Sequence, residues 1–256
     1  MARFDPFGDF DTAGYLQNAE GFKTASAVKR FEHREYQKAL PAATAALQTR
    51  DPLTYQDVLD THRRLFGRVY PTWAGKDRLA TFPDKAVNKG TISFAHPADI
   101  ARAVDHALQQ GRTSAAMREH AGEIMGFLAH AHPFLEGNGR TILAVHTELA
   151  RRAGISIDWR GMSHRDYLSA LTRELQQPSQ GQLDAYMKPF ISANPSKIVV
   201  PDHQPVLQPP APGARTLAQP SDVVKRAQIE EDRSGAPEAA PASAGKGRGR
   251  DGGSER

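Results

Sequence analysis

The chain has 256 residues, 39% of them hydrophobic, which is enough for one large domain or two small ones with a buried core. The absence of cysteine excludes disulfides, thiolate nucleophiles and thiolate metal sites. The net charge of +4 is mild and the basic residues are spread out, so nucleic-acid binding is not indicated.

The composition divides the chain into three segments. Residues 1–14 carry Asp, Gly and Phe without periodicity, and we expect an irregular arm there. Residues 15–193 contain the periodic apolar segments and form the expected folded domain. Residues 195–256 then contain nine of the chain's 18 prolines, and no aromatic residue follows Phe190. Such a segment cannot bury a core, so residues 194–256 are expected to form a disordered tail.

Two helical segments open the expected domain. Residues 25–47 are rich in Ala, Lys, Arg and Glu without Gly, which predicts one long helix or two. A second helix is expected to begin at Asp51-Pro52, because proline suits a first turn, and to end at Gly67.

The character of the sequence changes between Tyr70 and Pro97, where prolines and glycines interrupt helical patterns. Residues 79–82 and 91–94 favour extended chain, so we predict a β-hairpin or flap in this region. Helical spacing returns over residues 97–110.

The next helix is expected to start at Thr113 or Ser114 and to run directly to His132, with one apolar face. That face consists of Met117, Ala121, Ile124 and Leu128. A helix over residues 140–152 follows, with Gly154 as its stop, then a short link over residues 155–158. Two more helices are predicted over residues 163–176 and 183–191.

The loop at residues 132–140, between the helix that ends at His132 and the one that follows, carries the strongest functional signal. Gly137, Asn138 and Gly139 tolerate positive φ, so their consecutive N–H groups can turn to one side and form an anion-binding nest. The nest opens a helix, whose N-terminal dipole also favours negative charge. The sequence therefore predicts a phosphate site at the start of this helix.

Three charged or titratable side chains flank the nest. Arg140 adds a bidentate donor for phosphate, and Glu136 supplies a hard oxygen that suits Mg²⁺. His132 has a pKa suited to accepting a proton near neutrality. The structural alternative is a tight turn between two core helices, but a turn requires neither the carboxylate nor the arginine.

Residues 132–140 fill every fixed position of HPFx[D/E]GNGR, and so resemble the signature of the Fic family. Residues 70–78 and 89–94 resemble the segment that forms that family's target-binding flap. The resemblance covers about residues 15–193 and implies an all-α, Fic-type helical bundle with a small β-hairpin flap.

In that family the domain binds ATP with Mg²⁺ and transfers AMP to a hydroxyl side chain of a target protein, releasing pyrophosphate. By resemblance, His132 is the general base, Glu136 binds Mg²⁺, and residues 137–140 hold the phosphates. Flap residues Lys89, Gly90, Thr91 and Ile92 are expected to run beside the nucleotide, and Tyr167 is a candidate for the adenine pocket. Phe134 is expected to be a buried anchor of the loop.

The sequence departs from the family pattern at two points. Many members carry a second arginine where this chain has Leu143, and we find no complete [S/T]xxxE[G/N] inhibitory motif. Both departures suggest that a separate antitoxin-like protein inhibits the domain, or that the domain is not inhibited in this way at all. Two alternatives to AMP transfer therefore stay open: another nucleotide or phosphoryl donor on the same fold, and a non-catalytic nucleotide-binding or interaction module.

The expected location is the cytoplasm, without a membrane partner. The first residues lack an apolar signal core, and no run approaches the roughly 20 apolar residues of a membrane span. The alternative is a secreted effector, for which the basic stretch at residues 245–250 would serve as a secretion or docking signal rather than a solubilising tail.

Overall fold

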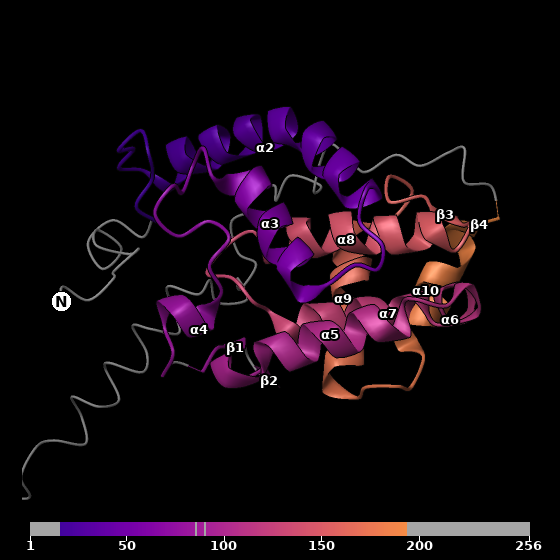
Figure 1. The fold of residues 1–256 in the computed structure, drawn as a ribbon. Coiled ribbons are helices and arrows are strands. Elements are labelled where there is room, and N and C mark those ends of the chain that lie inside the picture. Colours follow the sequence, from indigo (N-terminus) through magenta and orange to yellow (C-terminus); the bar gives the residue numbers. More distant parts are fainter. Residues whose placement is uncertain (1–15, 85, 90, 194–256) are drawn as a thin grey trace, which may run out of the picture.

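The computed structural model describes residues 16–84, 86–89 and 91–193, and these form a helical bundle. Figure 1 shows a long helix, α2 (Ala25–Gln48), lying across α3 (Tyr55–Phe66) and α8 (Asn138–Arg152). The remaining helices are α4 (Arg78–Thr81), α5 (Ile100–Gln110), α6 (Ser114–Glu119), α7 (Ala121–Ala131), α9 (His164–Gln176) and α10 (Gln182–Met187). The predicted all-α class is confirmed. The predicted arm at residues 1–14 and tail at 194–256 lie outside the described residues.

The segment predicted to form one long helix or two forms a single helix, α2. The Thr24 side chain caps it by accepting from the Ala27 N–H, and it continues through Pro41. Its buried face includes Phe31 and Tyr36, which pack with the end of α3 in one of two core clusters.

Helix α3 begins three residues later than the Asp51-Pro52 start that we predicted. Thr54 caps the helix and forms a capping box with Asp57, whose carboxylate accepts from the Thr54 N–H at 2.9 Å. This reciprocal pair provides a better start than a first-turn proline, because it satisfies two backbone donors. The predicted end at Gly67 is confirmed.

The flap is present but short. Strands β1 (Asn88–Lys89) and β2 (Ile92–Ser93) pair antiparallel, with Lys89 opposite Ile92. The prediction of extended chain at residues 79–82 is wrong, because Arg78–Thr81 forms the one-turn helix α4. The Asp77 side chain caps that turn by accepting from the Ala80 N–H at 2.8 Å.

The helix predicted from residue 113 to His132 is broken in two at His120. Thr113 caps α6 as predicted, but α7 starts again at Ala121. The carboxylate of Asp184 accepts from the N–H groups of Gly122 and Glu123, at 2.6 and 3.2 Å. This distant cap satisfies the orphan donors of a new helix start, which a local pattern cannot show.

The predicted helix at residues 97–110 is confirmed as a 3-10 turn, Pro97–Asp99, followed by α5. After α8, the expected link contains strand β3 (Ser156–Ile157), which pairs with β4 (Ile191–Ser192). The last predicted helix is therefore shorter than expected: α10 gives way to the 3-10 turn Lys188–Phe190 and then to β4.

The larger core cluster surrounds α7 and α8 and includes Phe134 and Leu143. Among the described residues, no helix combines the length and the apolar character that crossing a membrane requires.

Candidate active site at the start of α8

The loop from His132 to Gly137 joins the end of α7 to the start of α8. Both ends of the loop have left-handed backbone: His132 has φ 39° and ψ 57°, and Gly137 has φ 78°. Phe134 between them is fully buried, so the predicted anchor is confirmed. A non-glycine residue rarely holds positive φ unless its surroundings fix it, and such residues cluster at functional sites.

The side chain of Asn138 closes the loop on itself. Its Oδ1 accepts from the Phe134 N–H at 2.8 Å, and its Nδ2 donates to the Phe134 carbonyl at 2.7 Å. The same Nδ2 lies 3.3 Å from Nε2 of His132. Because Nδ2 is a donor, Nε2 acts as the acceptor in this arrangement and carries a lone pair. The imidazole is therefore held in the form that can accept a proton.

Two groups from the flap side fix His132. The ring of Phe94, directly after β2, stacks on the imidazole with centroids 4.1 Å apart. The buried side chain of Arg78 donates from Nε to the His132 carbonyl at 2.7 Å and from Nη2 to the Ala95 carbonyl at 2.6 Å. The Arg78 N–H also donates to the Pro133 carbonyl at 2.7 Å. One arginine thus ties the entry of the loop to the base of the flap.

His62 on α3 holds the other end of the loop. Its Nδ1 accepts from the Gly75 N–H at 2.9 Å, so Nε2 carries the proton and donates to the Glu136 carbonyl at 3.0 Å. The ring stacks on Phe134 with centroids 3.8 Å apart. Complete burial lowers the pKa of His62 to about 3, so it stays neutral at physiological pH.

At the start of α8, Glu136 is exposed and Gly137 is buried, and Gly137 alone of the three predicted nest residues has positive φ, because Asn138 and Gly139 are helical. The Glu136 side chain is 46% exposed, and its Oε1 accepts from the Gly137 N–H at 3.0 Å, which leaves oxygen lone pairs for a hard cation. Gly137 has no room for a side chain, because a Cβ there would lie 2.6 Å from the ring of Phe66. The donor set fits Mg²⁺ bound through one carboxylate and phosphate oxygens.

Arg140 lies beneath the loop, where only 11% of its side chain is exposed. Its guanidinium pairs with Glu32 of α2 and lies over the rings of Phe66 and Tyr36, at 4.6 and 5.4 Å. Burial lowers its pKa to about 10, which keeps it charged at neutral pH. The carboxylate of Glu136 is 3.8 Å away. The described arrangement therefore directs Arg140 toward Glu32.

Comparison with known proteins identifies the domain that contains this loop. The model of the Fic/DOC family matches residues 52–150, which include α3, the flap, the loop and most of α8. Residues 52–150 therefore match the Fic/DOC family.

Two curated relatives and one solved structure agree with this identification. Protein adenylyltransferase VbhT of Bartonella schoenbuchensis is 33% identical over 164 residues, which are 60% of this chain and 32% of VbhT. The probable protein adenylyltransferase y4lH of Sinorhizobium fredii is 33% identical over 122 residues, 44% of this chain and 60% of y4lH. The N-terminal Fic domain of a Bep effector protein of Bartonella quintana, solved with bound ADP, has a TM-score of 0.60 at 21% identity. That match covers 72% of this chain and 94% of the other, and it shows the Fic-type fold.

The chain spans only about a third of VbhT and three fifths of y4lH.

The structure brings some of the predicted Fic-domain site residues together and leaves others apart. The loop residues, including the exposed Gly139, share the start of α8. In the flap, Thr91 Oγ1 accepts from Gln176 Nε2 of α9 at 2.7 Å, and Ile92 is buried. Lys89 is placed by its pairing in β1, and Gly90 lies outside the described residues.

Tyr167 lies in a different part of the structure. It lies on α9 against Trp159, with ring centroids 6.1 Å apart, and burial raises the pKa of its phenol. Trp159 in turn donates to Thr147 in the second half of α8. These contacts tie Tyr167 to the C-terminal half of α8 rather than to the loop.

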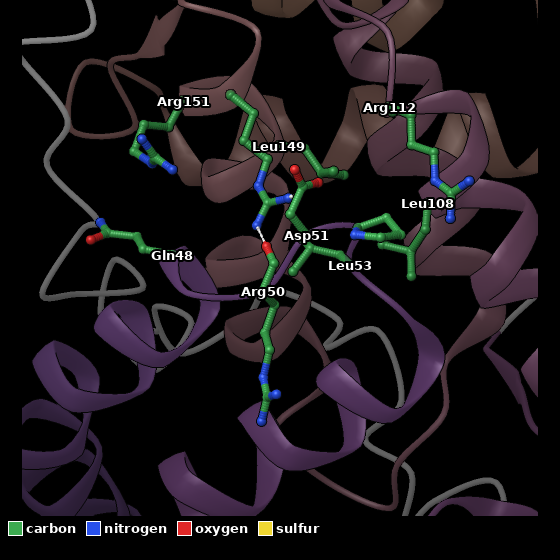
Figure 2. A pocket seen from close by; sticks show the side chains of 11 residues that line it. Gln48, Arg50, Asp51, Leu53, Leu108, Arg112, Leu149 and Arg151 are labelled. Carbon is green, nitrogen blue, oxygen red and sulfur yellow. Dashed lines mark hydrogen bonds and ion pairs between the residues drawn. The ribbon is translucent and has the colours of Figure 1, made fainter.

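Figure 2 shows a pocket lined in part by Leu149 and Arg151 near the C-terminal end of α8. Its volume is about 250 Å³, and none of its lining residues belongs to the loop at residues 132–140. Its lining includes Arg50, Arg151 and Arg152, but carboxylates already pair with these cations. Glu148 pairs with both Arg151 and Arg152, and Arg50 lies 3.3 Å from Asp57. The pocket is therefore separate from the predicted phosphate site.

Sequence reasoning missed three residues that hold the loop: His62, Glu32 and Phe94. His62 gives a weak signal, a polar residue on the buried face of α3 between Val58 and Leu65. The sequence marks Arg78 only through its resemblance to the family. Its burial, with two hydrogen bonds to the loop and one to Ala95, gives it a positioning role.

Proposed function

We propose that residues 15–193 form a Fic domain that transfers AMP from ATP to a Ser, Thr or Tyr hydroxyl of a target protein and releases pyrophosphate. The observation that carries this proposal is the imidazole of His132, whose Nε2 is held by the Asn138 side chain next to the N-terminus of α8. The relatives named protein adenylyltransferase support the same reaction.

In the proposed reaction, Nε2 of His132 takes the proton of the target hydroxyl. The hydroxyl oxygen bonds to the α-phosphorus of ATP, and the bond from that phosphorus to the bridging oxygen of the β-phosphate breaks. Pyrophosphate leaves with the electron pair, so atoms and charge balance. A positioned general base contributes about 10²- to 10⁴-fold in rate, and the remainder comes from holding the phosphates in line.

The residues at the start of α8 would hold the phosphates in line. The main-chain N–H groups of Gly137, Asn138 and Gly139 would contact the phosphates at the positive end of α8, which requires Glu136 to release the Gly137 N–H. Glu136 would hold Mg²⁺, which when bound neutralises charge between phosphate groups. Arg140 would contact the outer phosphates only by sharing its charge with Glu32. Lys89, Gly90, Thr91 and Ile92 would run beside the nucleotide and pair with the target segment, and Tyr167 is the candidate for the adenine pocket.

The experiment compares ATP labelled at the α- and γ-phosphates, with Mg²⁺ and a cell lysate. AMP transfer predicts protein bands labelled from α-labelled ATP alone, and their loss in His132→Ala. Labelling from γ-labelled ATP would show phosphoryl transfer on the same fold instead.

A second candidate function is non-catalytic nucleotide binding. It is favoured by the pairing of Arg140 with Glu32, and by the burial of Leu143 where many family members carry a second arginine. Calorimetry that detects ATP binding, together with no label transfer to any protein, would support it. Inhibition by a separate antitoxin-like protein and secretion of this protein as an effector are further proposals.

A further inference from the structure

Three side chains with metal-ligand atoms converge at the junction of α6 and α7: His120, Glu123 and Asp184. Nδ1 of His120 lies 3.8 Å from Oε2 of Glu123 and 3.9 Å from Oδ2 of Asp184. One ligand atom of each residue lies within 4.8 Å of the other two. The cluster is at the N-terminal end of α7, whereas His132 follows its C-terminal end, roughly 17 Å further along the helix axis.

Asp184 is held in place before any ligand arrives. Its Oδ1 accepts from the N–H groups of Gly122 and Glu123, at 2.6 and 3.2 Å, which leaves Oδ2 facing His120. The two backbones also approach closely, since a Cβ on Gly122 would lie 2.3 Å from the Asp184 nitrogen. Oriented carboxylates of this kind are typical of metal ligands, whose second oxygen is commonly hydrogen-bonded.

The spacing suits an ion better than direct hydrogen bonds. Donor and acceptor atoms in a hydrogen bond lie about 2.7–3.2 Å apart, and the atoms that face one another here are further apart. Ligands about 2.0–2.1 Å from a tetrahedral zinc ion lie roughly 3.4 Å from each other. Shifts of about half an ångström would therefore bring the imidazole nitrogen to that separation from each carboxylate, and the two carboxylate oxygens start within 4.8 Å of each other.

The chemistry of the set also fits. One imidazole and two carboxylates are nitrogen and oxygen ligands with two negative charges, which balance a divalent cation and suit Zn²⁺ or Mn²⁺. The imidazole is 54% exposed and the two carboxylates 20% and 16%, so water can reach a fourth position.

We propose that His120, Glu123 and Asp184 bind one divalent transition-metal ion, for which Zn²⁺ is the reference probe. The ion would link the start of α7 to α10, elements separated by some 60 residues that contact one another in the bundle. Its role would be to stabilise this end of the domain, since the proposed catalytic loop lies at the other end of α7.

The test titrates the metal-free, tag-free full chain with Zn²⁺ in a calorimeter and follows thermal unfolding. The expected result is one site that weakens at least about 10-fold in His120→Ala and in Glu123→Gln. Free Zn²⁺ at about 100 times Kd should raise the Tm of the parent protein by roughly 5 °C or more. His120→Ala changes an exposed side chain, so the variant should still fold.

Two control variants make the assignment specific. Glu119→Gln alters the carboxylate 3.9 Å from Nε2, the other nitrogen of the same imidazole, and should leave Zn²⁺ affinity within about two-fold. His132→Ala should also retain the site, which separates it from the catalytic loop. Absence of binding at about 0.1 mM Zn²⁺, well above the dissociation constants of structural zinc sites, would overturn the proposal. Unchanged affinity in His120→Ala, or loss of the site in His132→Ala, would overturn it equally.

Discussion

At the residue scale, Gly137 is constrained twice. Its φ of 78° is left-handed, and a Cβ would lie 2.6 Å from the Phe66 ring. Gly181 offers a matched control, with a φ of 67° and open space where a Cβ would lie, since nothing comes within 4 Å of that point. The two glycines thus share a left-handed backbone and differ in packing.

We expect Gly137→Ala to lower AMP transfer at least about 100-fold, because displacing Phe66 moves the nest away from the phosphates. Gly181→Ala should lower the free energy of unfolding by about 1 kcal/mol or more, because alanine is strained at positive φ. Its rate of AMP transfer should stay within about two-fold of the wild-type rate. Transfer rates and chemical denaturation of both variants check this. Equal loss of transfer in the two variants would count against a role for the nest.

Sequence patterns could predict the loop but not the residues that hold it. Its glycines, asparagine and histidine are adjacent in the chain, and each has a local reason to be there. Glu32 is 108 residues from Arg140, and His62 is 74 residues from Glu136. Nothing in local periodicity brings such pairs together, because their contact depends on how α2 and α3 pack on α8.

At the scale of elements, the pair of Glu32 and Arg140 links α2 to the start of α8. Both side chains are about nine-tenths buried, and Tyr70 also donates to Glu32, at 2.5 Å. Breaking a buried pair leaves one charge without a partner, which costs about 3–5 kcal/mol. A surface pair such as that of Arg63 and Asp60 contributes less than about 1 kcal/mol.

Glu32→Gln should therefore lower the free energy of unfolding by about 3 kcal/mol, and Asp60→Asn by less than about 1 kcal/mol. Urea denaturation of the two variants measures the difference. Similar losses would show that Arg140 does not depend on Glu32 in solution.

The predicted bounds of helices and strands were wrong where a cap or a strand partner distant in sequence decides them. The apolar face through Met117 and Leu128 is continuous in sequence, yet Asp184 caps a new helix start at Ala121. Strands β3 and β4 are two residues each and pair across about 35 positions, too short for any periodic signal. The longer helices α2, α5, α8 and α9 were predictable because their own patterns suffice.

At the scale of the whole molecule, two fully buried neutral histidines connect separate helices. His62 joins α3 to the loop, and His146 of α8 donates from Nε2 to the Ala121 carbonyl at 2.7 Å. Burial lowers the pKa of His62 to about 3 and that of His146 to about 4, against 6.5 when exposed.

The unfolded chain therefore binds these two protons at a higher pH than the native protein does. Stability is fully present above pH 6.5 and falls as the pH drops from 6.5 toward 4, by about 1.4 kcal/mol per pH unit for each histidine. Urea denaturation at pH 7, 6 and 5 measures how steeply the free energy of unfolding falls with pH. His62→Gln should reduce that slope by the contribution of one histidine, about 1.4 kcal/mol per pH unit. A slope unchanged in that variant would mean that His62 protonates in the native state.

The most direct test of the central claim measures α-phosphate label transferred by the wild-type protein and by His132→Ala, at ATP concentrations where calorimetry shows equal occupancy. We predict a drop of at least about 100-fold with ATP affinity within about three-fold, because the imidazole acts on the hydroxyl and not on nucleotide binding. Equal transfer by the two proteins at equal occupancy would contradict the assignment of His132 as the base.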